Sequence, residues 1–182
     1  MKKIVISLLI LVWVIYPGSK VLAQGDPSKV REQLKEFMWM EGDWKGDAWY
    51  MGRDQVKTPL IQKEHVELKL DGSIITMEGT GYSIPAGSES EKVVFQAFGI
   101  LTYDQIHSKF IIRAYQGGHF IDSDLVQNAD GSYSWGMELQ GGKIRYTLRL
   151  TEDGKWKEAG EFSRDGGANW FPIFEMTLSK QK

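Results

Sequence analysis

Three polar residues fall on strand faces that are otherwise apolar, and they are the first candidates for chemistry. Alternation along a strand puts each of them two positions from an apolar residue: Glu64, Glu158 and His119. A carboxylate on an apolar face must be paired, hydrated or protonated, because burying a lone charge costs several kcal/mol. In a wet interior these groups could hold the polar end of a ligand, or serve as acid and base in proton transfer. The alternative is that Glu64 and Glu158 lie near the rims of the sheet, in solvent or bonded to neighbours.

Aromatic residues are frequent on the same faces. The segment Lys143–Leu150 alternates strictly, with Ile144, Tyr146 and Leu148 on one side. If the sheet encloses a space, such a lining suits a flat or apolar guest. We therefore predict that ten residues line a ligand cavity: Tyr50, Glu64, Met77, His119, Tyr133, Trp135, Tyr146, Trp156, Glu158 and Trp170. The alternative is that the rings fill the interior as an ordinary core.

The chain lacks the short motifs of the common enzyme and metal-site classes. It contains no cysteine, which rules out disulfides, thiolate metal sites and cysteine nucleophiles. No G-x-S-x-G, H-E-x-x-H, P-loop or G-x-G-x-x-G pattern occurs. His119, Asp122 and Asp124 resemble a metal cluster, but on a strand the histidine faces opposite to both aspartates. We expect no catalytic motif and no metal site.

Turn signals at regular intervals define the elements that must position these residues. Dipeptides that accept the positive φ of tight hairpins recur along the chain: Asp71-Gly72, Gly117-Gly118, Asp130-Gly131, Gly141-Gly142 and Asp153-Gly154. Together with two further turns and two longer connections, Gly52–Pro59 and Ser83–Lys92, they separate ten strands. This spacing predicts an all-β fold, an up-and-down antiparallel β-barrel of about ten strands, with a two-layer sandwich as the main rival. Because alternate loops of such a sheet lie at the same end, the two long connections should share one end.

The N-terminal region differs from the rest in composition. A basic start and an unbroken apolar run, 4–16, are followed by small residues near Ala23. This predicts a secretory signal peptide, residues 1–23, because the run is shorter than the roughly 20 residues of a membrane span. We expect residues 24–182 to form a single β-barrel domain that is periplasmic or secreted after cleavage near Ala23.

A short helix should precede the strands. The apolar residues of this segment fall at helical spacing: Val30, Leu34, Phe37 and Met38. Ser28 can cap the first turn, so we predict a helix from about Lys29 to about Met38.

Charge and surface pattern bear on the partners. Loss of residues 1–23 removes three lysines and no acids, which moves the net charge from −2 to −5. No basic cluster remains, so we expect neither nucleic acid nor a membrane surface as partner. The strands that begin at Val93 and Phe110 are apolar on both faces, which leaves a homodimer open.

The segment around Trp44 resembles a known family. A helix followed by Gly42-Asp43-Trp44-Lys45-Gly46 is similar to the start of calycin barrels, the group of lipocalins, fatty-acid-binding proteins and nitrobindins. Later segments look closest to a bacterial family of exported calycin-like proteins of unassigned function: Gly99–Asp104, Trp156–Glu158, Asp165-Gly166 with Trp170, and Phe174–Leu178. The resemblance implies a barrel in which Trp44 packs across the closed end.

The same resemblance raises the question of haem, which nitrobindins bind through a histidine near the C-terminal strand. The three histidines of this chain lie elsewhere in the sequence: His65, His107 and His119. The last strand offers Phe174, Met176 and Leu178 instead. We expect no haem and no other cofactor.

Three functional hypotheses follow. The first is an exported, lipocalin-like barrel that binds a small, largely apolar or aromatic molecule in its lumen. The second is an enzyme that uses Glu64, Glu158 or His119 for proton transfer, and the third is a packed structural or interaction module without a ligand. Because no catalytic motif is present, the sequence favours ligand binding.

Overall fold

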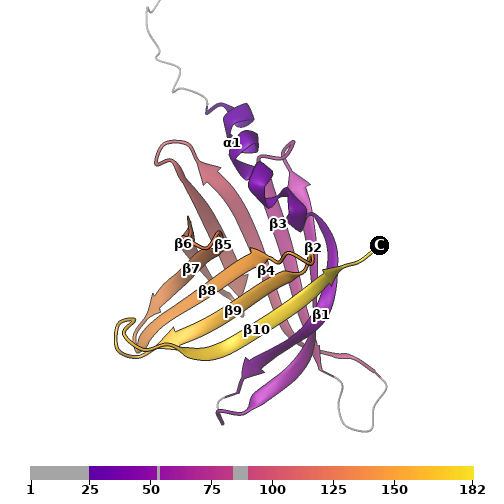
Figure 1. Ribbon diagram of the computed structural model, residues 1–182, viewed down its shortest axis with the longest axis vertical. Helices are drawn as coiled ribbons and strands as arrows, with labels where there is room; N and C mark the ends of the chain where they lie inside the picture. The colour runs from indigo at the N-terminus through magenta and orange to yellow at the C-terminus, as the bar shows by residue number, and fades with distance from the viewer. Residues whose placement is uncertain (1–24, 53, 84–89) are drawn as a thin grey trace, which may run out of the picture.

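The computed structural model describes residues 25–52, 54–83 and 90–182, and its strands form one closed barrel (Figure 1). Each strand pairs antiparallel with its neighbours in the chain, and the first strand pairs with the last. The strands are β1 Gly42–Met51, β2 Lys57–Lys69, β3 Ile74–Ser83, β4 Lys92–Asp104, β5 Lys109–Gln116, β6 His119–Gln127, β7 Tyr133–Leu139, β8 Gly142–Leu150, β9 Trp156–Ser163 and β10 Phe171–Lys180. The predicted ten-stranded up-and-down barrel is confirmed, and its closure excludes the two-layer sandwich. The expected signal peptide lies outside the described residues.

A helical segment closes one end of the barrel. Helix α1 (Pro27–Leu34) continues into a 3₁₀ helix, η1 (Lys35–Met40). Asp26 caps α1, because its carboxylate accepts a hydrogen bond from the Ser28 N–H at 2.9 Å, and Pro27 suits the first helical position. The helix therefore begins two residues before the predicted Lys29, with Asp26 rather than Ser28 as its cap. No helix in the described chain is long and apolar enough to cross a membrane.

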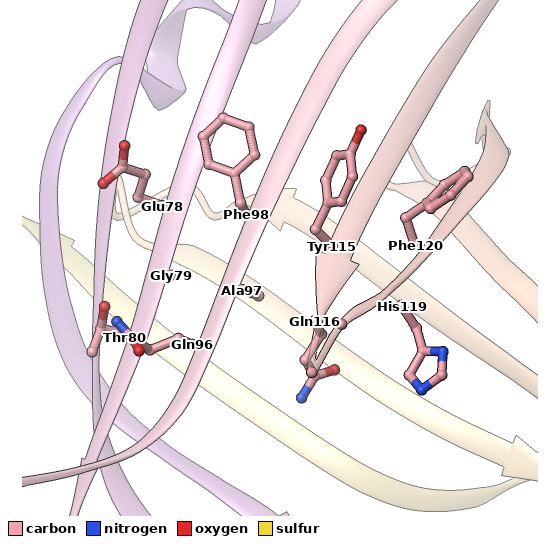
Figure 2. A pocket seen from close by; sticks show the side chains of 12 residues that line it. Glu78, Gly79, Thr80, Gln96, Ala97, Phe98, Tyr115, Gln116, His119 and Phe120 are labelled. Atoms are coloured by element: carbon pink, nitrogen blue, oxygen red, sulfur yellow. The ribbon is translucent and has the colours of Figure 1, made fainter.

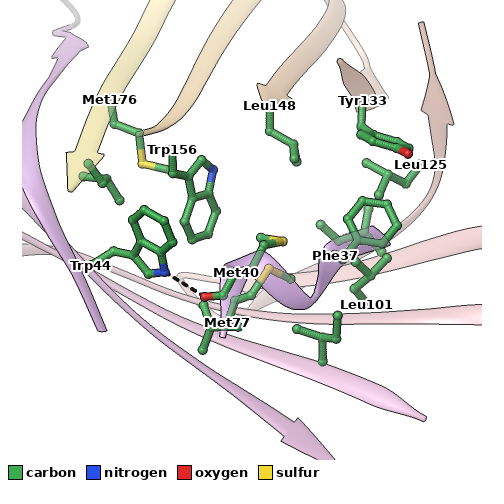
Figure 3. Close-up of a cluster of buried hydrophobic side chains, with 14 of the residues drawn as sticks. Phe37, Met40, Trp44, Met77, Leu101, Leu125, Tyr133, Leu148, Trp156 and Met176 are labelled. Carbon is green, nitrogen blue, oxygen red and sulfur yellow. Dashed lines mark hydrogen bonds between the residues drawn. The ribbon is translucent and has the colours of Figure 1, made fainter. Parts of the chain in front are cut away.

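The apolar core is concentrated at the helix end, where residues of η1 meet inward residues of the strands (Figure 3). Phe37 and Met40 are at most 1% exposed. The Trp44 indole Nε1 donates a 2.7 Å hydrogen bond to the Met40 carbonyl oxygen. Trp39, Trp44 and Trp156 meet edge to face, with ring centroids 5.7 to 5.9 Å apart, which is a favoured aromatic geometry. Trp44, two residues into the strand that Gly42 begins, therefore packs across the closed end, as the resemblance implied.

The opposite end of the barrel carries the longer connections. β1 ends and β2 begins at this end, away from α1 (Figure 1). β3 also ends here, and β4 also begins here. The connection 164–170 between β9 and β10 lies there as well. The described ends of the two long connections thus share one end of the barrel, as predicted, and that end lies opposite the helix.

The junction of β6 and β7 is the shortest ladder in the barrel. Within the described residues, the paired positions are Val126 with Ser134 and Gln127 with Tyr133, both near the helix end. Towards the open end, the Gly136 N–H donates to the Ser123 Oγ at 3.0 Å. This seam is held by far fewer main-chain bonds than the other ladders.

Candidate functional site

Strand alternation places two carboxyl groups inside the barrel. Glu64 lies on β2 between the buried residues Gln62 and Val66, and Glu158 lies on β9 two residues after the buried Trp156. Both glutamates are half-buried rather than buried, so water-sized space reaches them inside the wall. Their inward placement favours the interior site over the alternative that they lie at a solvated rim.

Burial changes the acidity of both groups. Removal from solvent raises the pKa of Glu64 to about 7, and a 2.7 Å hydrogen bond from Gln62 Nε2 to Glu64 Oε1 offsets part of this rise. Burial likewise raises the pKa of Glu158 to about 8, with a further contribution from the charge of Glu64. The Trp135 side chain lowers the pKa of Glu158 and so offsets part of this rise. Both carboxyls therefore change charge close to neutral pH, unlike a surface glutamate.

Polar atoms without partners lie in the same interior. Among the described residues, three buried side-chain atoms make no hydrogen bond of ordinary geometry: Gln62 Oε1, Trp135 Nε1 and Trp156 Nε1. Gln62 is only 1% exposed, and its amide nitrogen is bonded to Glu64. Buried polar groups in folded proteins are nearly always satisfied, so such atoms indicate a place for water or a ligand. Sequence reasoning missed Gln62, although its even spacing from Glu64 and Val66 was a sufficient signal.

A flat aromatic wall adjoins Glu158. The rings of Trp135 and Tyr146 stack with centroids 4.4 Å apart and planes at 19°, and Phe174 meets Tyr146 edge to face at 6.4 Å. Burial and the nearby Glu158 charge raise the pKa of Tyr146 to about 12, so its hydroxyl stays protonated. A side chain at Gly160 would put its Cβ 2.8 Å from the Tyr146 ring, so glycine leaves the space that the ring needs.

Glycine makes room for the other carboxyl as well. A Cβ at Gly79 would lie 2.7 Å from Glu64 Oε1 and 3.2 Å from Gln62 Nε2. The first distance is shorter than real Cβ contacts and the second is tight, so any larger residue would displace the Glu64 carboxyl. The pair of Gln62 and Glu64 thus occupies space that β3 leaves open.

Several other predicted lining residues belong to the closed end instead. The Tyr133 hydroxyl donates a short hydrogen bond to Glu36 of η1, and its ring lies 4.7 Å from that of Phe37. Met77 and Trp156 are buried in the core at the helix side. Tyr50 lies near the open end of β1, with 38% of its surface exposed. Tyr133, Met77 and Trp156 therefore mark the closed end of the candidate site, and Tyr50 marks its open end.

Trp170 is not where the alternation placed it. Its ring stacks on the Arg145 guanidinium at 4.2 Å, and Arg145 pairs with Glu161 on the outer wall at 2.7 Å. Trp170 precedes β10, and the register of β10 shifts between Pro172 and Phe174. The predicted inward placement was wrong because this irregularity breaks the two-residue period.

His119 lies apart from the two glutamates. It is exposed where the β5–β6 hairpin turns, and it lines a shallow groove of about 550 Å³ on the wall formed by β3 to β6 (Figure 2). Phe98, Tyr115 and Phe120 contribute aromatic side chains to that groove. The structure therefore brings Glu64 and Glu158 together but leaves the imidazole at the open end.

The described residues do not fit a haem site of the kind that the resemblance suggested. The inward side chains of β10 are Phe174, Met176 and Leu178, and the last two are buried in the core. His65 and His107 are exposed and bonded to Asp43 and Asp104, respectively. Within the described chain, no group of three or more histidine, aspartate or glutamate side chains could hold a metal ion.

Comparison with known proteins identifies the fold. No family model matches the chain, and no curated protein matches it. Among solved structures, the chain is similar to Rv2717c from M. tuberculosis, with a TM-score of 0.58 and 8% sequence identity over 82% of this chain and 97% of that one. It is also similar to the S-type phycobiliprotein lyase CPES from Guillardia theta, with a TM-score of 0.56 and 9% identity over 84% and 93% of the two chains. The barrel has a calycin-like fold. At sequence identities this low, the similarity to the two structures shows the fold alone.

Proposed function

We propose that this protein binds a small, largely apolar molecule in the barrel lumen, with the polar end of the ligand at Glu64 and Glu158. The observation that carries the proposal is that the inward side chains include two buried polar atoms without partners of ordinary geometry, Gln62 Oε1 and Trp135 Nε1, together with the stacked rings of Trp135 and Tyr146. Binding sites commonly combine apolar walls with a few convergent polar groups whose acidity is perturbed. Both kinds of group occur among the inward side chains of this barrel, which supports the proposal.

The similar structures add support at the level of architecture. One of them is a phycobiliprotein lyase, so a barrel of this kind serves at least one protein with a function beyond structural support. The similarity is one of fold and does not extend to the chemistry of that protein. What supports a lumen ligand here is the arrangement of this chain's residues.

A pair of tryptophan substitutions on β4 tests the proposal. Ala97 lies opposite the inward-facing Gly79, so Ala97→Trp should fill the space beside Glu64, whereas the exposed neighbour Gln96 points to the outer wall. The assay is a thermal-shift screen with lipids and aromatic metabolites, followed by native mass spectrometry of the hits. The proposal expects hits that Ala97→Trp abolishes and Gln96→Trp retains. Hits that are insensitive to Ala97→Trp would place binding outside the lumen and contradict the proposal.

Export of the protein is part of the proposal. The basic and apolar composition of residues 1–23 supports a cleaved signal peptide, which would deliver the barrel to the periplasm or the medium. N-terminal sequencing of protein recovered from those fractions should begin after Ala23. Full-length protein confined to the cytoplasm would contradict it.

The outer aromatic groove favours a second role, contact between two copies of the chain. The rings of Phe98, Tyr115 and Phe120 follow one another at 6.2 and 5.7 Å, and Phe120 is 59% exposed. An apolar stripe on an outer wall is typical of an interface. Light scattering during size-exclusion chromatography should give a dimer that Phe120→Asp converts to a monomer; a monomeric wild type would rule this role out.

A further inference from the structure

The acids of the lumen differ from several acids of the outer wall in having no basic partner among the described residues. On the outside, Glu161 pairs with Arg145 and Glu91 pairs with Lys63, each at 2.7 Å. Among the described residues, no lysine, arginine or histidine forms an ion pair with Glu64 or Glu158, and none lowers the pKa of either group. Two inward carboxyls therefore lie within electrostatic range of each other, and neither has an ion-pair partner among the described residues.

The basic residue that comes nearest in the register does not supply that cation. Lys180 pairs with Trp44 between β1 and β10, on the same strand face as Leu178. Its Nζ lies 3.3 Å from the Trp39 carbonyl oxygen and 5.5 Å from the Trp44 ring, at the closed end. The positive charge that would balance the lumen acids is thus absent from the described chain.

The remaining features of the lumen suit a cation that donates hydrogen bonds. Gln62 Oε1 is a buried acceptor without a donor, next to the Glu64 carboxyl. The Trp135 and Tyr146 rings present an aromatic surface, which attracts cations and stacks on flat molecules. The lumen thus offers an amide oxygen and two carboxyl groups as acceptors near a flat aromatic wall, with the Trp135 indole N–H as a donor.

Resting on the proposed function, we infer that the lumen ligand is a flat organic cation, an aromatic or heteroaromatic body with a protonated amine or amidine that donates to Glu64 and Glu158. The carboxyls would hold the cationic end through charge-assisted hydrogen bonds, and the rings of Trp135 and Tyr146 would hold the body. A carboxylate ligand would meet two acids and no base. A neutral ligand would leave the carboxyls without a counter-charge whenever they ionise.

The acidity of the site gives the inference a pH signature. Because the free protein keeps Glu64 and Glu158 protonated below about 7 and about 8, a cation must displace a proton when it binds at lower pH. Affinity should rise about tenfold per pH unit for each proton displaced and level off above about pH 8. Tyr146 is the other titratable group that faces the pair. The residues paired with Glu64 and Glu158 on the adjoining strands do not titrate: Trp44, Gly79, Leu148 and Met176.

Three matched probes separate the possible ligand classes. They share a naphthalene ring and differ in one group: 1-naphthylmethylamine, 1-naphthalenemethanol and 1-naphthoate. Isothermal titration of the full chain at pH 7.5 should give an amine affinity about tenfold to a hundredfold above that of the alcohol, as expected for a hydrogen bond to a charged group. The amine preference should fall on Glu64→Gln or Glu158→Gln and remain in Glu78→Gln, whose carboxyl is exposed on β3.

A neutral dye distinguishes failure of this inference from failure of the proposed function. Nile red fluorescence that Ala97→Trp abolishes reports an accessible lumen whatever the charge of its ligand. If the dye enters but the alcohol or the naphthoate binds as well as the amine, the cation inference is overturned and lumen binding stands. If neither the dye nor any naphthalene probe binds, both are overturned.

Discussion

The Glu64 carboxyl of β2 interacts electrostatically with the Glu158 carboxyl of β9 and raises its pKa. In the sheet, β1 and β10 separate the two strands, so the interaction runs through the interior rather than along the wall. It exists because the barrel closes: residues 94 positions apart come within electrostatic range when the last strand pairs with the first. The candidate site is therefore a direct product of closure.

Replacing Glu158 with glutamine should flatten the pH dependence of stability. The pKa of Glu158 is raised from its usual 4.5 to about 8, so between these values the folded state holds a proton that the unfolded chain has released. The contribution of Glu158 to the free energy of unfolding should therefore be largest below about pH 4.5. It should fall as the pH rises through about 8. Glu158→Gln stays neutral, so its Tm at pH 9 should exceed that of the wild type by at least about 2–4 °C, the shift that about 1 kcal/mol produces in a domain of this size.

Scanning calorimetry at pH 5, 7 and 9 measures this difference. Glu78→Gln removes an exposed carboxyl from β3 and should keep the wild-type slope. Parallel slopes for Glu158→Gln and the wild type would contradict a Glu158 that stays protonated inside the folded barrel.

Replacing Trp44 with phenylalanine should destabilise the closed end. The change removes the indole donor to the Met40 carbonyl oxygen and leaves that buried acceptor unpaired. The expected loss is about 1–3 kcal/mol in the free energy of unfolding, measured by urea denaturation. Trp49→Phe is the control, because Trp49 lies on the outer face of β1 under Lys57 and should cost less than about 1 kcal/mol. Equal losses for the two variants would show that Trp44 has no special role.

A methyl group at Gly79 should disturb the site directly. Its Cβ would lie 2.7 Å from Glu64 Oε1, so Gly79→Ala must displace the carboxyl and break the bond from Gln62. Because the Glu64 carboxyl is the free end of a flexible side chain, the loss of stability should be at most about 1 kcal/mol, and the main effect should be weaker binding of any lumen ligand. Gly141→Ala, with no atom within 4 Å of its Cβ, should change stability by less than about 0.5 kcal/mol. A Gly79→Ala variant as stable and as active in binding as Gly141→Ala would refute the packing described around Glu64.

The seam between β6 and β7 should open first. Only two residue pairs join these strands in the described ladder, so their amides towards the open end depend on few main-chain bonds. Hydrogen exchange followed by mass spectrometry should find faster exchange in peptides covering 119–125 and 135–139 than in those covering β1 to β3. Uniform protection around the barrel would contradict the weak seam.

Much of the fold could be predicted from the sequence, because its signals are local. Turn dipeptides mark the hairpins, and the two-residue period between them puts Glu64 and Glu158 on the inner face without knowledge of the register. The helix start was misplaced by two residues, since both Asp26 and Ser28 are capable caps and only the structure shows that the Asp26 carboxylate accepts from Ser28.

The remaining site residues depend on features that the alternation does not encode. The shift in β10 between Pro172 and Phe174 reverses the expected face of Trp170. The Tyr133 hydroxyl donates a hydrogen bond to Glu36, and no local sequence pattern reveals this contact across 97 positions. Gln62 shares the inward spacing of Glu64, but an uncharged amide carries no charge whose burial must be compensated, so its sequence signal is weaker than that of a carboxylate.

The most direct test of a ligand site in the lumen is the ¹H–¹⁵N spectrum of the tryptophan indoles, assigned by single Trp→Phe variants and recorded with and without 1-naphthylmethylamine. A molecule seated between Glu64 and Glu158 should shift the Trp135 indole resonance, whose N–H has no partner of ordinary geometry in the described chain. The resonances of Trp49 and Trp170, which lie against Lys57 and Arg145 on the outer wall, should stay in place. Shifts confined to Trp49 or Trp170, with Trp135 unmoved at saturation, would contradict the account.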